Sequence, residues 1–395
     1  MSFDKPIYLD HAATTPTDER VLGEMLPYFS GVFGNASSTH RMGRKAIAAV
    51  DSARERVAKA IGASPGEIYF TSGGTEGDNW AIEGVARAYG EKGKHIVSSA
   101  IEHPAVLQAL RRLEKEGFEV TYLPVDREGF VSPEAAIAAF RPDTILLSLM
   151  LANNEVGTIQ PVKDIAKEAH ARGILVHTDA VQAVGSIPVA VRDLGVDLLT
   201  LSAHKFYGPK GVGALYLRKG CRIKGLLVGG EQERALRAGT YNTPAIVGLG
   251  KAIELATEEL SLRAKHLSEL KSNFREKLAE LPFVTVNGGE PALPGTINLL
   301  FRGAKNDDLL SALDLEGIAA SAGSACSSGS VEPSHVLTAM GLSKKEVTSS
   351  LRFSFGKENT REEVDRTLAV LEKLLPRLRG ESDLFLLDEK ETYEV

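Results

Sequence analysis

Cysteine is nearly absent from this 395-residue sequence, which holds only Cys221 and Cys326. Two thiols cannot make the disulfide framework of a small secreted protein, and neither lies in a C-x-x-C pair of the kind that binds zinc. The chain therefore suits a reducing compartment, and each thiol has to be judged singly.

Long apolar runs and an excess of positive charge are also missing. No stretch approaches the roughly 20 apolar residues that a membrane-spanning helix needs, and no signal-peptide pattern opens the chain. Basic and acidic residues number 46 and 52, which gives a net charge of −6, and the basic run at residues 218–224 is short. We therefore expect a cytoplasmic protein without a membrane or nucleic-acid partner.

What remains is the composition of an ordinary globular protein, with 43% hydrophobic and 25% charged residues. Strand patterns alternate with helical patterns such as 43–61 and 162–171, which favours an α/β fold with ligands at the carboxyl ends of the strands. A further helix is expected to begin at Pro16. The expected strands of this part are 7–9, 67–71, 95–99, 119–125, 144–150, 174–179, 198–202 and 213–217.

A long helical pattern at 243–281 marks the boundary to a smaller domain. Beyond it the sequence predicts two strands, at 296–301 and 350–355, and helices at 307–315 and 362–378. An acidic tail follows from Glu381.

Lys205 stands just after the apolar strand 198–202. A charged amine at a buried strand end is costly, so desolvation lowers its pKa and leaves an amine that can form a Schiff base. A surface lysine in a loop would give the same local pattern.

Asp179 ends the preceding apolar strand in the same way. Its carboxylate could pair with the pyridinium nitrogen of pyridoxal 5'-phosphate (PLP), the cofactor that a Schiff-base lysine suggests. Gln182 could donate a hydrogen bond to the ring oxygen of that cofactor. Alternatively, Asp179 caps a helix that begins at Ala180.

Three other segments could serve the same site. Residues 71–79 turn from a strand through two glycines into a helix, where the amides and the Thr75 hydroxyl could bind a phosphate; an ordinary strand-to-helix turn would look alike. His103, after a strand, could stack on a cofactor ring or transfer protons. Alternatively, it is a packed residue or a helix cap. Asn154 could hydrogen-bond a phenolic oxygen, or be a turn residue.

Cys326 lies in residues 321–330, a segment made almost wholly of Gly, Ala and Ser. Such composition predicts a mobile loop, and a thiol on a loop without bulky apolar neighbours favours a reactive role. Cys221 stands among basic residues that could lower its pKa, but no motif surrounds it. Arg352, in an alternating strand, offers a fork for a substrate carboxylate, or else forms a structural ion pair.

In this order and spacing, the motifs resemble those of the cysteine desulfurases of the class V aminotransferase group, and most closely the NifS/IscS-like branch. The resemblance extends from about residue 7 to residue 375. It rests on residues 8–15, 71–76, 102–103, 153–155, 179–182, 202–205, 237–240, 324–326 and 352–354.

The resemblance implies a PLP-dependent transferase of fold type I. Its large domain, residues 15–257, would hold a mainly parallel seven-stranded sheet flanked by helices. Its smaller α+β domain would comprise residues 1–14 and 258–395, with the cysteine loop at about 321–335 and a C-terminal helix and tail.

The resemblance also implies roles for single residues. Lys205 would hold PLP as a Schiff base, Asp179 would pair with the ring nitrogen, and His103 would stack on the ring and transfer protons. Gln182 and Asn154 would hold the phenolic oxygen. The phosphate would be bound by Gly74, Thr75, Ser202 and His204, with Thr240 reaching in from the second subunit of a homodimer.

By the same resemblance, the enzyme would convert L-cysteine to L-alanine. Arg352 and Asn154 would bind the substrate, and Cys326 would take up the sulfur as a persulfide for an acceptor such as an IscU/NifU-type scaffold in iron–sulfur cluster assembly. No permanent metal site is expected, although Cys326 could transiently ligate a cluster.

Alternatives and departures remain at this point. The fold would also suit a PLP aminotransferase, a selenocysteine lyase or a non-catalytic partner protein. Gly74 and Gly77 stand where many relatives have Ala and Ser, and Ala152 stands where a polar residue is frequent.

Overall fold

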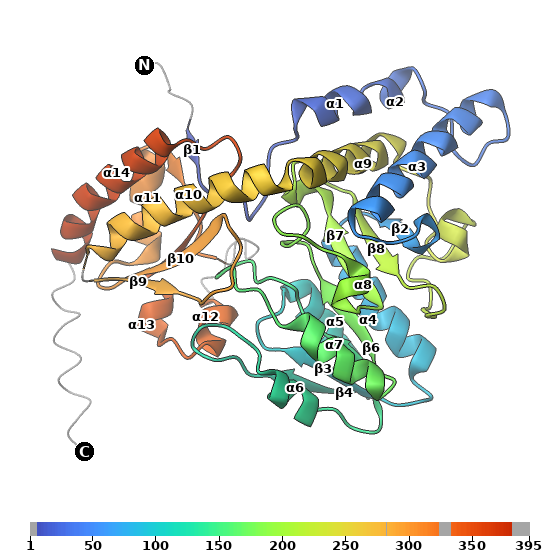
Figure 1. Cartoon of the computed structure of the whole chain (residues 1–395), viewed down its shortest axis with the longest axis horizontal. Coiled ribbons are helices and arrows are strands. Elements are labelled where there is room, and N and C mark those ends of the chain that lie inside the picture. Colours follow the sequence, from blue (N-terminus) through green and yellow to red (C-terminus); the bar gives the residue numbers. More distant parts are fainter. Residues whose placement is uncertain (1–5, 282, 324–332, 381–395) are drawn as a thin grey trace.

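The structure is a computed structural model that describes residues 6–281, 283–323 and 333–380. Its larger part is built on one seven-stranded sheet, at the right of Figure 1. The order of its strands is β2 (Ile68–Thr71), β8 (Gly213–Leu217), β7 (Leu198–Ser202), β6 (Leu175–Asp179), β5 (Thr144–Ser148), β3 (His95–Ser99) and β4 (Glu119–Leu123).

Strands β7, β6, β5, β3 and β4 run parallel, and β8 is antiparallel to both of its neighbours. Strand β2 therefore points the same way as β7, so six strands have their carboxyl ends at one edge. The expected seven-stranded, mainly parallel sheet is confirmed.

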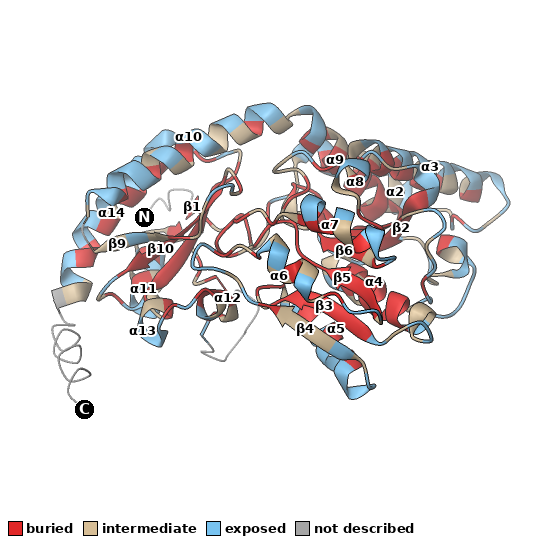
Figure 2. Cartoon of the chain, turned by 60° about the horizontal axis from the view of Figure 1, so that its bottom comes forward, coloured by how far each residue is buried: buried red, intermediate tan, exposed pale blue. Residues whose placement is uncertain are grey.

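Helices cover both faces of this sheet, because alternate side chains of its strands enter two hydrophobic clusters. Val176, Leu199 and Tyr216 belong to the first cluster, and Leu198 and Leu215 to the second. The first face is covered by α3 (Arg41–Ala60), α6 (Pro133–Ala138), α7 (Val162–Ala171), α8 (Val191–Leu194) and α9 (Thr243–Glu258), and the second by α4 (Gly74–Tyr89) and α5 (Pro104–Lys115). In Figure 2 the inner strands of the larger sheet are buried, the edge strand β4 is only partly buried, and the outer helix faces are exposed.

The smaller part has its own hydrophobic cluster, which gathers residues from both ends of the chain, among them Leu9, Phe274 and Phe353. Its antiparallel sheet has the order β12 (Ser350–Ser354), β10 (Thr296–Phe301) and β9 (Val284–Asn287), and β1 (Ile7–Tyr8) pairs in parallel with β11 (Ile318–Ala319). Its helices are α10 (Leu260–Ala279), α11 (Asn306–Leu315), α12 (His335–Ala339), α13 (Lys344–Val347) and α14 (Arg361–Gly380).

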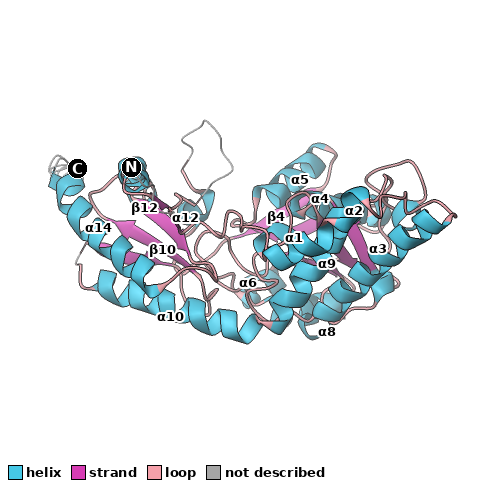
Figure 3. Ribbon diagram, turned by 90° about the horizontal axis from the view of Figure 1, so that it is seen from above, coloured by secondary structure: helices cyan, strands magenta, loops and turns pink. Residues whose placement is uncertain are grey.

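Figure 3 shows the two sheets side by side, with α10 running along the smaller part toward α9. The expected helical stretch at 243–281 is thus two helices, and they meet at Glu259. The first packs on the larger sheet and the second on the smaller one.

Two expected helix starts are wrong. The helix expected from Pro16 is α1 (Glu19–Met25), which begins only after Asp18, whose side chain accepts a hydrogen bond from the Arg20 amide at 2.9 Å; a short α2 (Pro27–Ser30) follows. No helix begins at Ala180, because residues 181–183 form a turn. In the part of the chain that the structure describes, no helix is both long and apolar enough to cross a membrane.

Candidate active site

The side chains expected at the site follow the carboxyl ends of neighbouring strands. Asp179 is the last residue of β6, and Lys205 closes a short 3-10 turn directly after β7. His103 precedes α5 after β3, and Gly73 lies between β2 and α4. Since these strand ends share one edge, residues far apart in the sequence come together there.

Lys205 is held by a segment from the amino-terminal end of the chain. Its amine donates hydrogen bonds to the backbone oxygens of Ala12 at 2.5 Å and Ala13 at 2.9 Å. Thr15 joins the same segment to the 3-10 turn that contains Lys205. Its hydroxyl donates a hydrogen bond to the His204 oxygen at 2.9 Å and accepts one from the Tyr207 amide at 2.8 Å. The lysine is half-buried and directed into the protein, which excludes the surface-loop interpretation.

Asp179 is buried, and its Oδ1 accepts a hydrogen bond from the Val181 amide at 2.8 Å. This bond closes the turn that stands in place of the expected helix. Burial raises the pKa of Asp179, whereas His103, the Val181 amide and Lys205 oppose that rise. The carboxyl group thus lies within electrostatic range of both basic side chains.

His103 caps α5, since its Nδ1 accepts a hydrogen bond from the Ala105 amide at 3.1 Å. Burial lowers its pKa, the negative charge of Asp179 raises it, and the positive charges of Lys205 and His335 lower it. A carboxyl group, an imidazole and an amine therefore share one site. The capping alternative and the proton-transfer role are compatible, because capping uses only one ring nitrogen.

At the amino terminus of α4, Gly73 and Gly74 leave the backbone without side chains opposite Ser202, and we call this place the α4 hollow. Gly73 has a φ of 151°, which favours glycine, and a Cβ built there would lie 3.7 Å from the Ser202 hydroxyl. A Cβ at Gly74 would lie 2.8 Å from Val181 Cγ2. Since no side chain of the described residues caps α4, its first amides remain available to an anion. Thr75 is exposed in the first turn.

His204 lies next to this hollow and hydrogen-bonds the Thr14 hydroxyl through Nδ1 at 3.1 Å. Burial and the positive charges of Lys205 and Lys210 lower its pKa to about 4. The ring is therefore neutral near pH 7, which leaves it one N–H donor. Gln182 donates to the Ala12 oxygen at 3.0 Å and thus lies beside the lysine.

Arg352 is buried and forms the ion pair that the alternative interpretation predicted, with Nη2 2.7 Å from Asp10 Oδ1. Its Nη1 donates to the backbone oxygens of Asn154 at 2.9 Å and Gly323 at 3.3 Å. Within the described ranges its Nε finds no hydrogen-bond partner. A role in substrate binding stays a prediction.

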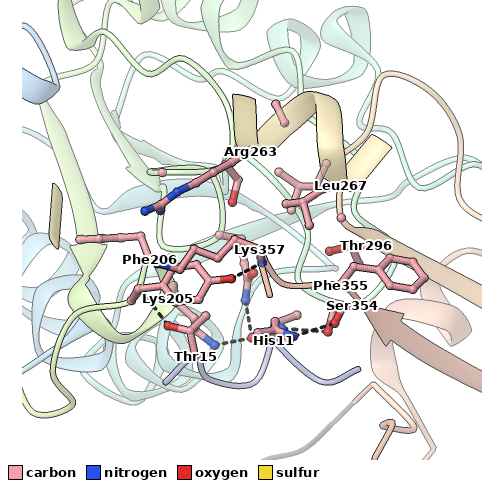
Figure 4. Close-up of a pocket in the computed structure, with 18 residues that line it drawn as sticks. His11, Thr15, Lys205, Phe206, Arg263, Leu267, Thr296, Ser354, Phe355 and Lys357 are labelled. Atoms are coloured by element: carbon pink, nitrogen blue, oxygen red, sulfur yellow. Dashed lines mark hydrogen bonds between the residues drawn. The ribbon is translucent and has the colours of Figure 1, made fainter. Parts of the chain in front are cut away.

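A cavity of about 60 Å³ lies on another side of Lys205 (Figure 4). Its lining includes Arg263, Thr296 and Lys357 as well as Lys205, but neither Asp179 nor His103. The acid and the imidazole therefore do not line this cavity.

This donor set fits PLP. The amine of Lys205 can meet an aldehyde, the buried acid of Asp179 can meet a ring nitrogen, and the hollow at α4 can take a phosphate. In the part of the chain that the structure describes, no cluster of three or more His, Cys, Asp or Glu side chains could hold a metal ion.

Three other expectations have different outcomes. Cys326 lies outside the described residues, and Thr240 is exposed. The expectation that basic neighbours lower the pKa of Cys221 is wrong: burial, together with Asp197, whose Oδ1 lies 3.7 Å from the thiol, raises that pKa to about 11. Cys221 is therefore a protonated thiol near neutral pH.

Sequence reasoning missed Asp10, Ala12 and Ala13 as parts of the site. The two alanines act through backbone oxygens, which leave no signature in the sequence. Asp10 and Arg352 are 342 positions apart in the sequence, so no local pattern predicts their pairing.

Comparisons with known proteins agree with this geometry. The model of the aminotransferase class-V family matches residues 7–367. The chain is 51% identical over 382 residues to the cysteine desulfurase IscS of Methanosarcina thermophila, covering 96% of this chain and 95% of that relative. It is 52% identical over 377 residues to the cysteine desulfurase IscS of Dictyoglomus turgidum, covering 95% and 96%.

Among solved structures, a NifS-like protein superposes with a TM-score of 0.90 at 42% identity, covering 94% of this chain and 100% of that one. A cysteine desulfurase from Thermococcus onnurineus NA1, solved in its apo form, superposes with a TM-score of 0.85 at 26% identity and covers 94% and 95%.

Proposed function

This chain belongs to the aminotransferase class-V family and, within it, to the cysteine desulfurases of the NifS/IscS-like branch, and from this premise we propose that it transfers the sulfur of L-cysteine to Cys326 and releases L-alanine. PLP is the cofactor of this family. When bound, PLP withdraws electrons from the α-carbon of the amino acid attached to it. The observation that carries the proposal is the meeting of Lys205, Asp179 and His103 at one strand edge beside the α4 hollow.

We assign the cofactor contacts as follows. Lys205 holds the aldehyde carbon, Asp179 the ring nitrogen, and Gln182 and Asn154 the phenolic oxygen, while His103 stacks on the ring. The phosphate is held by Gly74, Thr75, Ser202 and His204, together with Thr240 of the second subunit. The hollow between α4 and Ser202 and the neutral state of His204 support these assignments.

Lys205 and His103 would move the protons of the reaction. Burial lowers the pKa of His103, so its imidazole is able to accept a proton near neutral pH. The amine of Lys205, once released from the cofactor, would take the proton from the substrate α-carbon. Both groups lie within electrostatic range of Asp179, which supports their acting on one substrate.

Arg352 would bind the substrate carboxylate. Both terminal nitrogens of its guanidinium group donate to oxygen atoms, namely those of Asp10 and of two backbone carbonyls. Its Nε has no partner within the described ranges. A carboxylate would satisfy that donor, and the guanidinium is the side chain best suited to hold it.

Cys326 would act as the nucleophile. Its thiolate attacks the substrate sulfur, the sulfur–sulfur bond forms as the carbon–sulfur bond of cysteine breaks, and the substrate carbon takes up a proton to give alanine. The persulfide then passes to an acceptor by thiol exchange. We propose a scaffold protein of the IscU/NifU kind in iron–sulfur cluster assembly as that acceptor, with Cys326 as a transient cluster ligand at most.

We also propose that the enzyme is a cytoplasmic homodimer. Leu22, Leu26, Phe29 and Phe33 are large apolar side chains that follow one another along the outer surface at 46%, 56%, 61% and 68% exposure. Four large exposed apolar side chains within twelve residues of the sequence favour a protein interface there. The scarcity of cysteine supports a reducing compartment.

The test is an assay of alanine and sulfide released from L-cysteine in the presence of a thiol reductant. The Cys326→Ala variant should retain bound PLP and lose at least about 100-fold in sulfide release, because the nucleophile is gone. Cys221→Ala, the matched control, should keep its rate. Full sulfide release by Cys326→Ala would contradict the assignment of Cys326 as the nucleophile.

A further inference from the structure

A second buried carboxyl group, Asp78, lies near Asp179, and no step described so far uses it. Asp78 belongs to α4 and is 1% exposed. Its Oδ1 lies 3.6 Å from His177 Nε2, which is too long for a hydrogen bond, and has no other partner within residues 6–281, 283–323 and 333–380. An acid so deeply buried needs a physical reason.

The packing of α4 on the sheet brings Asp78 to this place. His177 and Asp179 are two residues apart on β6 and so point to the same face. Thr200 is the register partner of Asp179 on β7. A Cβ at Gly77 would lie only 2.6 Å from Thr200 Cγ2, so glycine lets α4 lie close against β7. The next residue, Asp78, thereby reaches the strand that carries Asp179.

A chain of hydrogen bonds surrounds Asp78. The Ser148 hydroxyl lies 2.9 Å from His177 Nδ1, and His177 Nε2 lies 3.1 Å from the Thr200 hydroxyl. The Thr200 hydroxyl also faces the Asp78 carboxyl group, where it lowers the pKa of that acid. Burial lowers the pKa of His177 to about 3, so its ring is neutral and offers Asp78 no positive charge.

The two carboxyl groups have unequal surroundings. Asp78 is faced by His177 and Asp179 from β6, by Thr200 from β7 and by Glu102 from the end of β3, and none of these is a cation. Asp179 is within range of His103 and Lys205 and also accepts the Val181 amide. Two carboxylates that share a space without water cannot both ionise readily, and the one near the cations keeps the charge.

We propose that Asp78 is a positioning residue for the cofactor: it remains protonated beside Thr200 and so leaves the negative charge of the pair on Asp179, where the ring nitrogen of the cofactor would meet it. Burial, and next the charge of Asp179, raise the pKa of Asp78 well above its usual range. This inference rests on the proposed function only in that the protein binds PLP at Lys205.

A pH dependence follows. Burial and the charge of Asp179 raise the pKa of Asp78, so this acid ionises only at a higher pH than a free carboxyl group does. Its ionisation would add a second negative charge next to Asp179 and disturb the charge that the ring nitrogen meets. Asparagine has the shape of the protonated acid and cannot ionise, so Asp78→Asn should remove this alkaline change.

The experiment records the absorption of bound PLP in the holoenzyme from about pH 6 to about pH 10, together with cofactor loss on dialysis, for the wild type, Asp78→Asn and Asp179→Asn. We expect an alkaline transition in the wild type that is missing in Asp78→Asn. At neutral pH, Asp78→Asn should hold PLP within about twofold of the wild type, whereas Asp179→Asn should lose at least about tenfold.

Two results would overturn the proposal. One is an Asp78→Asn protein that at neutral pH loses PLP or shifts its absorption as far as Asp179→Asn does, since Asp78 would then carry charge. The other is identical titration of the wild type and Asp78→Asn, since the ionisation of Asp78 would then have no effect on the cofactor.

A second pair of variants covers the case in which Asp78→Asn does not fold. Thr200→Val removes the hydroxyl that lowers the pKa of Asp78 and should move the alkaline transition to higher pH, and Thr200→Ser keeps that hydroxyl and should move it less. Equal shifts in the two would also overturn the proposal. None of these measurements uses L-cysteine, so failure of the proposed activity would be seen separately.

Discussion

Glu102 is a buried carboxyl group whose protonation can be followed through stability. It is 0% exposed, and burial raises its pKa to about 8, although the Ser99 hydroxyl and the Met150 amide donate to its Oε1. The folded protein therefore binds a proton at Glu102 that the unfolded chain releases near pH 4.3. Stability should fall as the pH rises between these two values.

We predict that Glu102→Gln removes this contribution. The variant should resemble the wild type at pH 4 and gain relative stability toward pH 8, by at most about 1.4 kcal/mol for each pH unit. Denaturant unfolding at several pH values measures this, with the exposed Glu91→Gln as a control that should change nothing. A constant difference between Glu102→Gln and the wild type at all pH values would contradict the prediction.

Single residues were predictable where they end apolar strands. Lys205, Asp179 and His103 stand out because a charged or polar residue interrupts an apolar pattern, and the structure brings the three together. Asp78 and His177 gave no such signal, because each lies inside an element among other polar residues. Only the packing of α4 on the sheet gives them their surroundings.

At the scale of elements, α4 can pack closely on β7 because Gly77 has no side chain. We predict that Gly77→Ser lowers the free energy of unfolding by about 1–3 kcal/mol, because the new Cβ would lie 2.6 Å from Thr200 Cγ2.

The matched control is Gly66→Ser. A Cβ at Gly66 meets nothing within 4 Å, so this variant should unfold like the wild type. Both are compared by denaturant unfolding of the cofactor-loaded protein. Equal midpoints for the two variants would show that α4 can move away from the sheet at little cost.

The strands of the larger sheet were easier to predict than the helix starts. Apolar runs of four to six residues between turn residues mark a buried parallel strand. The start at Asp18 and the turn after Asp179 depend instead on which side chain accepts a backbone amide. Strand β9 was missed, since its side chains are only partly buried and its pattern is weak.

At the scale of the molecule, a chain of ion pairs joins the two parts. Lys357, which follows β12, and Arg20 both pair with Asp18, and Arg20 also pairs with Glu259 at 2.6 Å, while Glu259 pairs with Arg263 at 2.6 Å. Tyr207 lies within this group, with Lys357 over its ring at 4.5 Å.

We predict that Asp18→Asn destabilises the protein by about 1–3 kcal/mol, because two cations lose their shared partner while asparagine still caps α1. The pKa of Asp18 is held below its usual range chiefly by Arg20, so its contribution is present above pH 4 and is lost in acid. The wild type and variant should therefore converge as the pH falls.

Thermal unfolding at several pH values tests this. Glu269→Gln is the control, since the Glu269–Lys265 pair is 65% and 75% exposed and 3.9 Å long, and such pairs contribute little. A wild type and an Asp18→Asn protein that unfold alike at neutral pH would mean that this chain of ion pairs does not stabilise the protein.

The division into two parts could be predicted only in outline. The helical pattern at 243–281 located a boundary, but helix α9 packs on the larger sheet and α10 on the smaller. Residues 7–9 belong to the smaller part because β1 pairs with β11, which is more than 300 residues away in the sequence. Hydrophobic periodicity carries no information on such pairings.

The hydrogen bonds from Lys205 to the backbone oxygens of Ala12 and Ala13 have a consequence for biosynthesis. The segment that positions this amine leaves the ribosome long before the residues that anchor it, which are Ile318–Ala319 of β11 and Ser354, whose hydroxyl accepts a hydrogen bond from the Ala12 amide at 2.9 Å. A nascent chain long enough to fold its larger sheet would still lack both anchors. Capture of the vitamin-derived coenzyme should therefore follow translation rather than accompany it.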